Sequence, residues 1–296
     1  MTMAGGPTPL PATLVQAAIH AALAEDLGLL GDITTDATVA ASTVASAVIA
    51  ARAPGVVSGL QLAQAAFRAL DPDVMIEIAS PDGSRIAAGA VIAHIKGNAR
   101  AILTAERVAL NFMGRMSGIA TLTRRYIDAV KDTNAKIADT RKTTPGLRAF
   151  EKYAVRCGGG QNHRSGLFDA VLIKDNHIVA AGGLAKAIVA ARARAGHMLR
   201  IEVEVDTLEQ LKEVLEYKID AVLLDNMSPA ILAKAVKLVA GRCLTEASGG
   251  VNLETVRAIA GSGVDLVSVG ALTHSAPVLD LGLDFTPQPS GKTRRA

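Results

Sequence analysis

The chain has 296 residues, half of them hydrophobic and only 3% aromatic, and its 31 basic and 28 acidic residues give a formal net charge of +3 at pH 7. The basic residues are spread along the chain and aromatic rings on which bases could stack are scarce, so the composition argues against a nucleic-acid-binding protein. Two cysteines are too few for a disulfide framework, no apolar run reaches the length of a membrane span, and the first residues do not form a signal peptide. We therefore expect a cytoplasmic protein with no membrane segment, folded as two domains with aliphatic cores.

The N-terminal half alternates helical and extended patterns at uneven intervals. Three prolines mark residues 1–11 as a flexible leader, and Gly28 follows the first helical pattern as its C-cap. The expected elements are a helix over 12–27, strands over 45–52, 74–79 and 90–96, a helix over 60–70, and a long helix, bent at Ser117-Gly118, that leads into the second half. Strands and helices in this order predict a small α+β domain.

The C-terminal half repeats one pattern six times, in which a short apolar run ends at a polar residue or a glycine. The runs are 136–140, 170–173, 201–203, 221–224, 243–247 and 266–269. Each step between runs has room for a helix and two loops, as in the helical patterns over 184–195, 207–217 and 229–240, the last with Ser228 as N-cap and Pro229 in the first helical position. Six such units predict a (β/α) barrel that is two units short of the usual eight.

The ends of the predicted strands supply the candidate site. Barrels of this kind carry their catalytic residues at the C-terminal ends of the strands and bind phosphate at the loops of the last two strands. By this rule the candidates are Arg141, Lys142, Lys174, Glu204, Asp225, Ser248, Gly249, Gly250, Gly270 and Ala271. A doubly wound open sheet has similar spacing and stays open as an alternative, but its polar residues would concentrate at one switch point instead of closing every strand.

Cations cluster in the first part of this half. Arg141, Lys142, Arg156, His163, Arg164, Lys174 and His177 lie close together in the sequence, around three consecutive glycines at 158–160. Taken singly, most are better explained as ordinary surface residues. Lys174 differs because it directly follows an apolar run, and a cation at the mouth of a buried strand is desolvated unless an anion meets it. The cluster therefore predicts a site for a ligand with several negative charges, gripped by Arg forks and Lys point charges.

Two acids and several glycines complete the pattern. Glu204 and Asp225 lie at the ends of neighbouring strands. They could hold a divalent metal on a phosphate ligand or stabilise positive charge in a transition state. Alternatively, they are structural partners of the cations and have no role in chemistry. The glycines at 249, 250 and 270 let backbone N–H groups approach a phosphate, or are ordinary turn residues. Together these residues predict an enzyme that joins an anionic acceptor to a sugar phosphate.

Several longer strings resemble the quinolinate phosphoribosyltransferase family, also called carboxylating nicotinate-nucleotide pyrophosphorylases. In the second half these are DTRKTTPG (139–146), KYAVRCGGGQNHR (152–164), LIKDNH (172–177), EVEVD (202–206), LLDNM (223–227) and GALTH (270–274). EDLGLLGDITT (25–35) and LTAERVALNFMGRMSGIAT (103–121) extend the resemblance to the first half. It covers nearly the whole chain apart from the two ends.

The resemblance implies a fold and a reaction. The fold is a small N-terminal α/β sandwich domain over 12–118, with segment 275–286 packing back on it, an incomplete (β/α) barrel over 119–274, and flexible tails at 1–11 and 287–296. The reaction is Mg²⁺-dependent phosphoribosyl transfer from phosphoribosyl pyrophosphate to quinolinate, with decarboxylation, which gives nicotinate mononucleotide, pyrophosphate and carbon dioxide. The family also implies a homodimer with shared active sites, and a higher oligomer stays open.

The resemblance also implies roles for individual residues. Glu204, Asp225, Lys142 and Lys174 would be catalytic, with Glu204 and Asp225 facing a Mg²⁺ ion held mainly through phosphoribosyl pyrophosphate. The implied substrate-binding residues are Arg107, Thr140, Arg141, Lys142, His163, Arg164, Lys174, Glu204, Asp225, Ser248, Gly249, Gly250, Val269, Gly270, Ala271 and His274. Arg107 would complete the site of the neighbouring subunit. Ala247 departs from the family pattern, which more often has Ser there.

Other functions stay open from the sequence. A relative of this fold could use nicotinate without decarboxylation, and a molybdenum-transport-associated relative has no settled chemistry. The number of cations favours a dianionic acceptor over a monoanionic one. A lyase that uses Lys174 as a Schiff base belongs to a different mechanistic class, and a non-enzymatic binding module would show no turnover.

Overall fold

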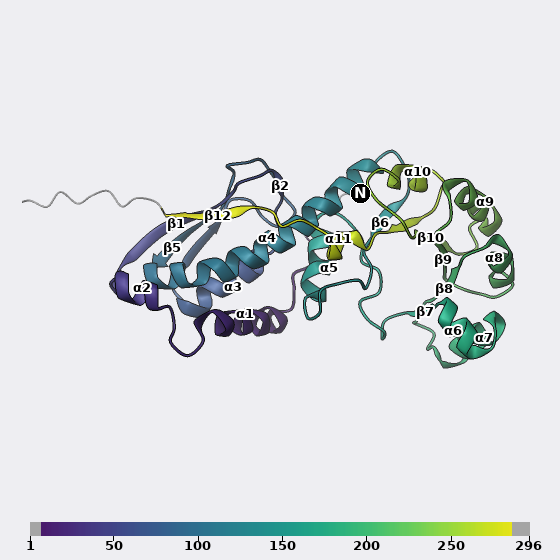
Figure 1. Cartoon of the computed structure of the whole chain (residues 1–296), viewed down its shortest axis with the longest axis horizontal. Helices are drawn as coiled ribbons and strands as arrows, with labels where there is room; N and C mark the ends of the chain where they lie inside the picture. Colours follow the sequence, from purple (N-terminus) through teal and green to yellow (C-terminus); the bar gives the residue numbers. More distant parts are fainter. Residues whose placement is uncertain (1–6, 286–296) are drawn as a thin grey trace, which may run out of the picture. The chain divides into compact units, whose positions relative to one another are not determined.

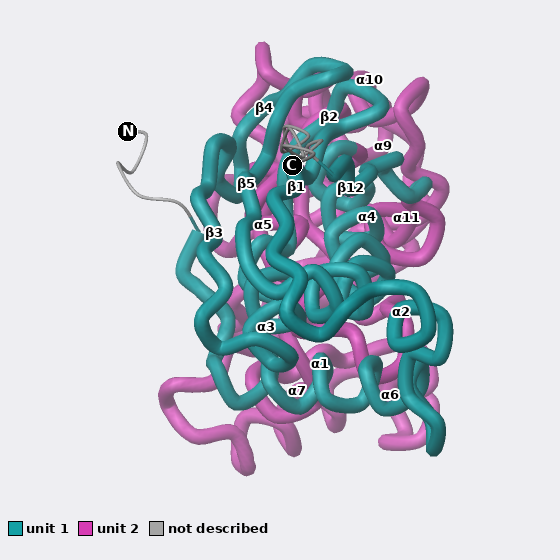
Figure 2. The backbone as a smooth tube through the Cα atoms, turned by 90° about the vertical axis from the view of Figure 1, so that its left-hand side faces the viewer, with its two compact units in different colours: residues 1–121, 277–296 teal, residues 122–276 magenta. Residues whose placement is uncertain are grey.

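The computed structural model describes residues 7–285 and divides the chain into two compact units. The first contains residues 1–121 and 277–296, and the second residues 122–276 (Figure 2). The expected domain boundary after residue 118 lies three residues before the observed division. Of the expected tails, residues 1–6 and 287–296 lie outside the described residues.

The N-terminal unit is built on a four-stranded antiparallel sheet. Its order is β12-β1-β5-β3, with β12 at Leu281–Phe285, β1 at Val44–Ala51, β5 at Val91–Asn98 and β3 at Met75–Ile78. A two-stranded sheet joins β2 (Gly55–Val56) to β4 (Arg85–Ile86). The helices are α1 (Ala12–Leu27), α2 (Ile33–Thr38), α3 (Leu60–Leu70) and the first part of α4 (Ala99–Ala129), and Figure 1 shows α1, α3 and α4 gathered on one side of the larger sheet.

Alternating burial explains this layered arrangement. In β5, Ile95 is buried while His94 and Lys96 are exposed, so one face of the sheet meets the helices and the other meets solvent. The last strand, β12, pairs with β1 and places Leu283 opposite Ile49. The segment that follows the second unit thus returns to the first.

This unit differs from the sequence prediction at Leu10, while the bend predicted for the long helix at Ser117-Gly118 stays a prediction. Leu10, in the expected leader, is 6% exposed, and its backbone N–H and carbonyl both bond the Gln61 side chain, at 2.9 and 3.0 Å. The long helix α4 stays helical through Ser117 and Gly118. A Cβ atom on Gly118 would lie 1.9 Å from the carbonyl oxygen of Pro277, so this glycine permits a close backbone approach.

The C-terminal unit contains a six-stranded parallel sheet with helices between its strands (Figure 1). The strands are β6 (Lys136–Ala138), β7 (Val171–Ile173), β8 (Ile201–Val205), β9 (Ala221–Asp225), β10 (Leu244–Ser248) and β11 (Leu266–Ser268). The helices are the last part of α4, α5 (Arg148–Cys157), α6 (Asp175–Ala181), α7 (Leu184–Arg194), α8 (Leu208–Val214), α9 (Pro229–Val239), α10 (Val256–Ala260) and α11 (Ala271–His274). Pro229 begins α9 as predicted, but the Ser228 side chain makes no cap hydrogen bond.

The strand order decides between the two architectures that the sequence left open. The order is β6-β11-β10-β9-β8-β7, so neighbours follow one another from β7 to β11 and the first strand joins the last. A doubly wound sheet would reverse direction at a switch point. This sheet has no such switch point. Its two edge strands are β6 and β7, which do not pair with each other, so the barrel is incomplete as predicted.

Candidate active site

A cavity of about 730 Å³ opens at the C-terminal ends of the barrel strands. It brings together the sequence-predicted residues Thr140, Arg141, Lys142, His163, Arg164, Lys174, Glu204, Asp225, Ser248, Gly249, Gly250, Gly270, Ala271 and His274. Residues from the ends of all six strands and the loops after them therefore converge on one space, as expected for parallel strands that share an edge.

Two predicted residues do not line this cavity. Val269 is 1% exposed, and its N–H donates to the carbonyl of Ala138, so it joins β11 to β6. Arg107 belongs to the N-terminal unit, where its side chain is exposed and lies 3.9 Å from Glu106. Of the other clustered cations, Arg156 lies over the ring of Tyr153, and Nδ1 of His177 accepts the N–H of Lys174 at the start of α6.

The side chains that face the cavity form two levels, because successive residues of a strand point to opposite faces. Lys174, Glu204, Asp225, Ser248 and Gly270 lie at the mouth. Two residues earlier on four of these strands come Leu172, Leu223, Glu246 and Ser268, which form the floor, while the corresponding Glu202 of β8 lies behind it against His163. The sequence analysis missed Glu246 and Ser268, although counting back two residues from each strand end would have found both.

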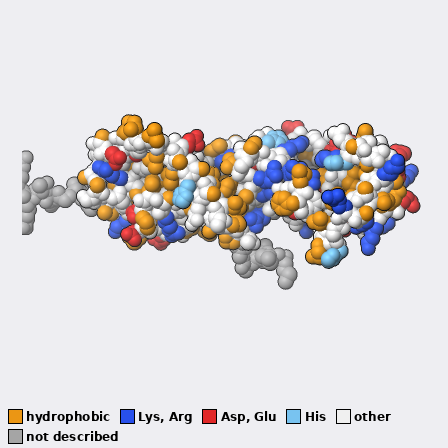
Figure 3. Space-filling model, turned by 90° about the horizontal axis from the view of Figure 1, so that it is seen from below, with side chains coloured by type: hydrophobic (Ala, Val, Ile, Leu, Met, Phe, Trp, Pro, Cys, Tyr) orange, Lys and Arg blue, Asp and Glu red, His pale blue; other side chains and the backbone are white. Residues whose placement is uncertain are grey.

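Arg141 and Arg164 present desolvated positive charge. The Nε atoms of both are buried and have no hydrogen-bond partner in the described chain. Burial and the neighbouring charge of Arg141 lower the pKa of Arg164. Although basic residues are spread along the sequence, Lys and Arg side chains gather in one part of the surface on the face shown in Figure 3. Buried guanidinium groups without partners are stabilised when an anion binds to them.

A buried ion pair holds the loops that carry these cations. Asp139, which is fully buried, pairs with Lys152 and accepts the backbone N–H of His163 at 2.8 Å and Nδ2 of Asn162 at 2.6 Å. Lys152 in turn donates to the carbonyl of His163 at 3.0 Å. The end of β6, helix α5 and the loop at 161–164 are thereby tied together, which places Arg141 beside Arg164. The sequence analysis assigned this pair no role.

At the mouth, the predicted acids lie beside cations. Lys174 pairs with Glu204, and the side chain of Lys174 is 45% exposed while that of Glu204 is 12% exposed. Burial and the charge of Asp206 raise the pKa of Asp225, while Lys174 and Lys142 act against this shift. The Asp225 carboxylate also accepts a hydrogen bond from Nδ2 of Asn226, with 2.6 Å between the two atoms. Two carboxylates at neighbouring strand ends offer the oxygen ligands that Mg²⁺ prefers.

The loop after β10 begins with two glycines in left-handed backbone conformations. Gly249 has φ +90° and Gly250 has φ +62°, conformations that favour glycine. A Cβ atom on Gly249 would lie 2.1 Å from Oδ1 of Asn226, and one on Gly270 would lie 3.1 Å from Cδ of Lys142. Close backbone approach at this edge suits an anionic group such as phosphate.

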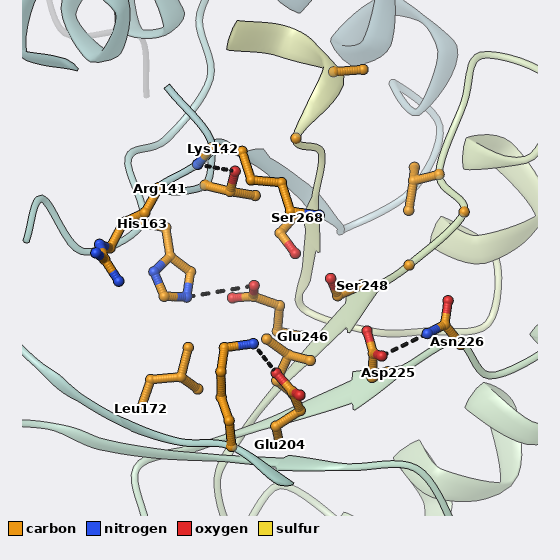
Figure 4. Close-up of a pocket in the computed structure, with 18 of the residues that line it drawn as sticks. Arg141, Lys142, His163, Leu172, Glu204, Asp225, Asn226, Glu246, Ser248 and Ser268 are labelled. Carbon is orange, nitrogen blue, oxygen red and sulfur yellow. Dashed lines mark hydrogen bonds and ion pairs between the residues drawn. The ribbon is translucent and has the colours of Figure 1, made fainter. Parts of the chain in front are cut away.

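His163 connects the mouth to the floor. Its Nδ1 accepts the N–H of Arg164 at 2.8 Å, and its Nε2 lies 3.0 Å from Glu202 and 3.6 Å from Glu246. Figure 4 shows the Glu246 carboxyl directed toward the His163 ring. Both ring nitrogens are occupied within the protein, so the predicted contact of His163 with a substrate carboxylate would need its ring to turn. These three residues are also close enough together to hold a metal ion.

Comparison with known proteins covers nearly the whole chain. The model of the quinolinate phosphoribosyl transferase C-terminal domain matches residues 119–284, and that of the N-terminal domain matches 32–117. The chain is 48% identical over 274 residues to the nicotinate-nucleotide pyrophosphorylase [carboxylating] of Mycobacterium leprae, covering 90% of this chain and 95% of the relative. It is 45% identical over 262 residues to the probable enzyme of that name from Bacillus subtilis, covering 88% and 90%. The solved nicotinate-nucleotide pyrophosphorylase of Francisella tularensis superposes with a TM-score of 0.89 at 39% identity, covering 95% of this chain and 99% of that one.

Proposed function

We propose, since this chain belongs to the quinolinate phosphoribosyltransferase family, that it is a pentosyltransferase that joins quinolinate to the ribose of phosphoribosyl pyrophosphate and releases pyrophosphate and carbon dioxide. The observation that carries this proposal is the facing pair Arg141 and Arg164, whose buried Nε atoms lack partners at the wall of a cavity that also holds Lys174. Several convergent cations match a ligand with two carboxylates.

Each wall of the cavity would take one part of the substrates. Arg141, Arg164 and Lys174 would grip the two carboxylates of quinolinate, since guanidinium forks bind carboxylate oxygens in pairs. The glycine loop after β10 and the start of α11 would take the 5′-phosphate of the second substrate. Lys142, which lies beside Gly270 at this edge, would contact the same substrate. A carboxylate of quinolinate that pairs with Lys174 would replace Glu204 in the present ion pair, and Glu204 could then face the ribose.

Glu204 and Asp225 would hold Mg²⁺, largely through the pyrophosphate of the bound substrate. Their carboxylate oxygens are suitable ligands for this ion, and the two side chains lie at the ends of neighbouring strands of the sheet. When bound, the ion would neutralise charge on the leaving pyrophosphate. The two carboxylates would also stabilise the positive charge that develops on C1 of the ribose as the ring nitrogen of quinolinate attacks.

The order of charges explains the loss of carbon dioxide. Once the ring nitrogen is bonded to ribose it is quaternary, and it can stabilise the electron pair left on C2 when the carboxylate departs. The protein contributes by holding both reactants in the reacting geometry, a contribution worth several orders of magnitude. No covalent intermediate with the enzyme is required.

Two further features are proposed from the family resemblance. Arg107 would complete the active site of a second subunit, so the active form would be a homodimer or a higher oligomer. The location would be the cytoplasm. Between residues 7 and 285 no helix combines the length and apolarity needed to cross a membrane.

A turnover assay tests the proposal directly. Incubation with quinolinate, phosphoribosyl pyrophosphate and Mg²⁺ should yield nicotinate mononucleotide, and removal of Mg²⁺ with a chelator should stop the reaction. Nicotinate should react at least about 100 times more slowly, because a monoanion leaves a buried cation without a partner at a cost of about 3 to 5 kcal/mol. Equal turnover of both acids would favour the non-decarboxylating alternative, and no turnover of either would favour a binding module.

A further inference from the structure

The reaction proposed above requires a proton, a requirement that rests on that function. When the bond between C2 and its carboxylate breaks, the electron pair stays on C2 and carbon dioxide leaves. The product carries hydrogen at C2, so one proton must reach this carbon. A buried acid at the wall of the substrate cavity could deliver it without admitting solvent to the reactive carbon.

The floor of the cavity holds one such group. Glu246 lies on β10, two residues before Ser248, and it is 2% exposed although it lines the cavity. Its Oε1 atom has no hydrogen-bond partner in the chain from 7 to 285. Figure 4 shows this carboxyl inside the ring of substrate-facing residues, close to His163 and Ser268. It lies on the floor of the same cavity whose wall carries Arg141, Arg164 and Lys174, the cations proposed to bind the acceptor.

The contacts of His163 indicate how many protons the cluster holds. Because Nδ1 of His163 accepts the N–H of Arg164, the ring can carry its proton on Nε2 only, where it faces Glu202 at 3.0 Å. Nε2 is 3.6 Å from Glu246, too far for a good hydrogen bond. Two carboxyl groups therefore share a buried space with a single imidazole ring, and carboxyl groups this close to each other favour a proton on one of them.

Glu246 is the better place for that proton. Glu202 is the less buried of the two, at 8% exposed, and it already accepts the His163 hydrogen. The charged groups around Glu246 are Glu202 on β8, His163 in the loop before β7 and Asp139 after β6, with the Ser268 hydroxyl on β11. Burial and the charges of Glu202 and Asp139 raise the pKa of Glu246 to about 7, although His163 and Ser268 act against the shift.

We propose that Glu246 donates the proton that replaces the departing carboxylate at C2 of the pyridine ring. The electron pair left on C2 takes the carboxyl hydrogen of Glu246, a C–H bond forms, and Glu246 becomes a carboxylate. After the products leave, water returns a proton to Glu246 and the cycle closes. Glu202 would be a positioning residue, since its negative charge keeps the neighbouring carboxyl protonated, and His163 would act by holding Glu202 in place.

The test compares Glu246→Gln with Glu202→Gln in the full-length enzyme. Both changes keep the size of the side chain, and both alter the surroundings of His163, but only the first removes the proposed donor. The measurements are release of pyrophosphate and of carbon dioxide in single turnovers across pH, KM for quinolinate, and a thermal melt. Wild-type turnover of quinolinate comes first, since its absence would contradict the proposed function and not the role of Glu246.

Glu246→Gln should slow carbon dioxide release about 100-fold or more, with KM for quinolinate changed less than about threefold. In the wild type this rate should fall as the pH rises through the pKa of Glu246, because the carboxylate has no proton to give. Glu202→Gln should move this basic limb to lower pH, because it removes a charge that keeps Glu246 protonated, and Glu246→Gln should lose the limb. Glu246→Asp retains an acid and should recover part of the rate of carbon dioxide release. It takes the place of Glu246→Gln in the comparison if Glu246→Gln melts at a lower temperature than the wild type.

Three results would overturn the proposal. The first is carbon dioxide release by Glu246→Gln within about threefold of the wild-type rate at every pH. The second is an equal rise in KM for quinolinate in both glutamine variants with kcat unchanged, which would give Glu246 only a role in holding His163. The third is a zinc ion that the purified enzyme retains and that Glu246→Gln loses, since His163, Glu202 and Glu246 would then be metal ligands.

Discussion

The two units of this chain treat buried polar groups in different ways. In the N-terminal unit, the buried Ser117 hydroxyl accepts the N–H of Ser58 at 2.9 Å and donates to its carbonyl at 3.1 Å. In the described chain, the buried side-chain nitrogen and oxygen atoms without a partner are Ser58 Oγ in the N-terminal unit and, in the barrel, Arg141 Nε, Arg156 Nε, Arg164 Nε, Glu202 Oε1 and Glu246 Oε1.

This difference separates stability from function. An unpaired buried polar group costs free energy, so a fold keeps one where a ligand will satisfy it. The N-terminal unit, where Ser58 Oγ is the one such atom among the described residues, can contribute stability without taking part in chemistry. The barrel retains unsatisfied charge at its cavity, as expected where binding is the purpose. Substitutions in the two units should therefore affect different measurements.

The largest expected effect is that of Lys174→Ala on activity. This side chain is 45% exposed and pairs with Glu204, so its removal should leave the melting temperature within about 3 °C of the wild type. The value of kcat/KM for quinolinate should fall by about two to four orders of magnitude, because a substrate carboxylate loses its cation. A melt that collapses together with activity would give Lys174 a structural role.

Arg107→Ala tests whether the N-terminal unit takes part in chemistry after all. The family resemblance implies that Arg107 completes a neighbouring subunit's site, so the variant should be inactive yet folded. Mixed with Lys174→Ala chains, it should regain partial activity, because a mixed dimer contains one site with both residues intact. Failure to regain activity, in a preparation shown by mass spectrometry to exchange subunits, would remove the shared site.

Lys152→Met should destabilise the barrel strongly. It leaves Asp139 buried and charged without its partner, a change that typically costs about 3 to 5 kcal/mol. Denaturant unfolding should show the loss, and activity should fall with it because the loops that carry Arg141 and His163 lose their anchor. The double variant Lys152→Met, Asp139→Leu is the control, and it should recover part of the stability since no buried charge remains.

Two glycine substitutions form a matched pair across the units. Gly118→Ala would place Cβ 1.9 Å from the Pro277 carbonyl, and it should cost about 1 to 3 kcal/mol of stability. Gly249→Ala meets Asn226 at the cavity and has φ +90°, so it should chiefly raise KM for phosphoribosyl pyrophosphate. A higher KM for phosphoribosyl pyrophosphate in Gly118→Ala, without one in Gly249→Ala, would contradict the assignment of stability to the N-terminal unit and of substrate binding to the barrel.

The smallest effect is expected for the exposed pair Arg52–Asp284 of the N-terminal unit. The hydrogen bond and charge of Arg52 lower the pKa of Asp284 from its ordinary value of 3.8. The stabilisation is therefore present above that ordinary value and is lost as the pH falls through the lowered pKa. Because both side chains are exposed, Asp284→Asn should change the melting temperature by less than about 2 °C at pH 7, and the difference should vanish once the pH lies below the lowered pKa of Asp284.

Local patterns in the sequence were sufficient for most elements and for the mouth of the site. The helices over 12–27 and 60–70 have the predicted bounds, because apolar spacing and end residues act within a few turns. Strand ends such as Lys174, Glu204 and Asp225 could be grouped without a structure, since parallel strands of a barrel share one edge. The cavity brings these predicted residues together.

Other features depended on which atoms meet in three dimensions. The sequence by itself determined the two-domain composition, the six βα units and the residues that close the strands, all of which follow from short-range periodicity. Only the tertiary structure decided that the sheet curls into an open barrel, that Asp139 and Lys152 form a buried pair, and that Glu202 and Glu246 face His163. Burial and pairing depend on contacts between segments far apart in the chain, and no local pattern specifies which of two alternating faces will meet another.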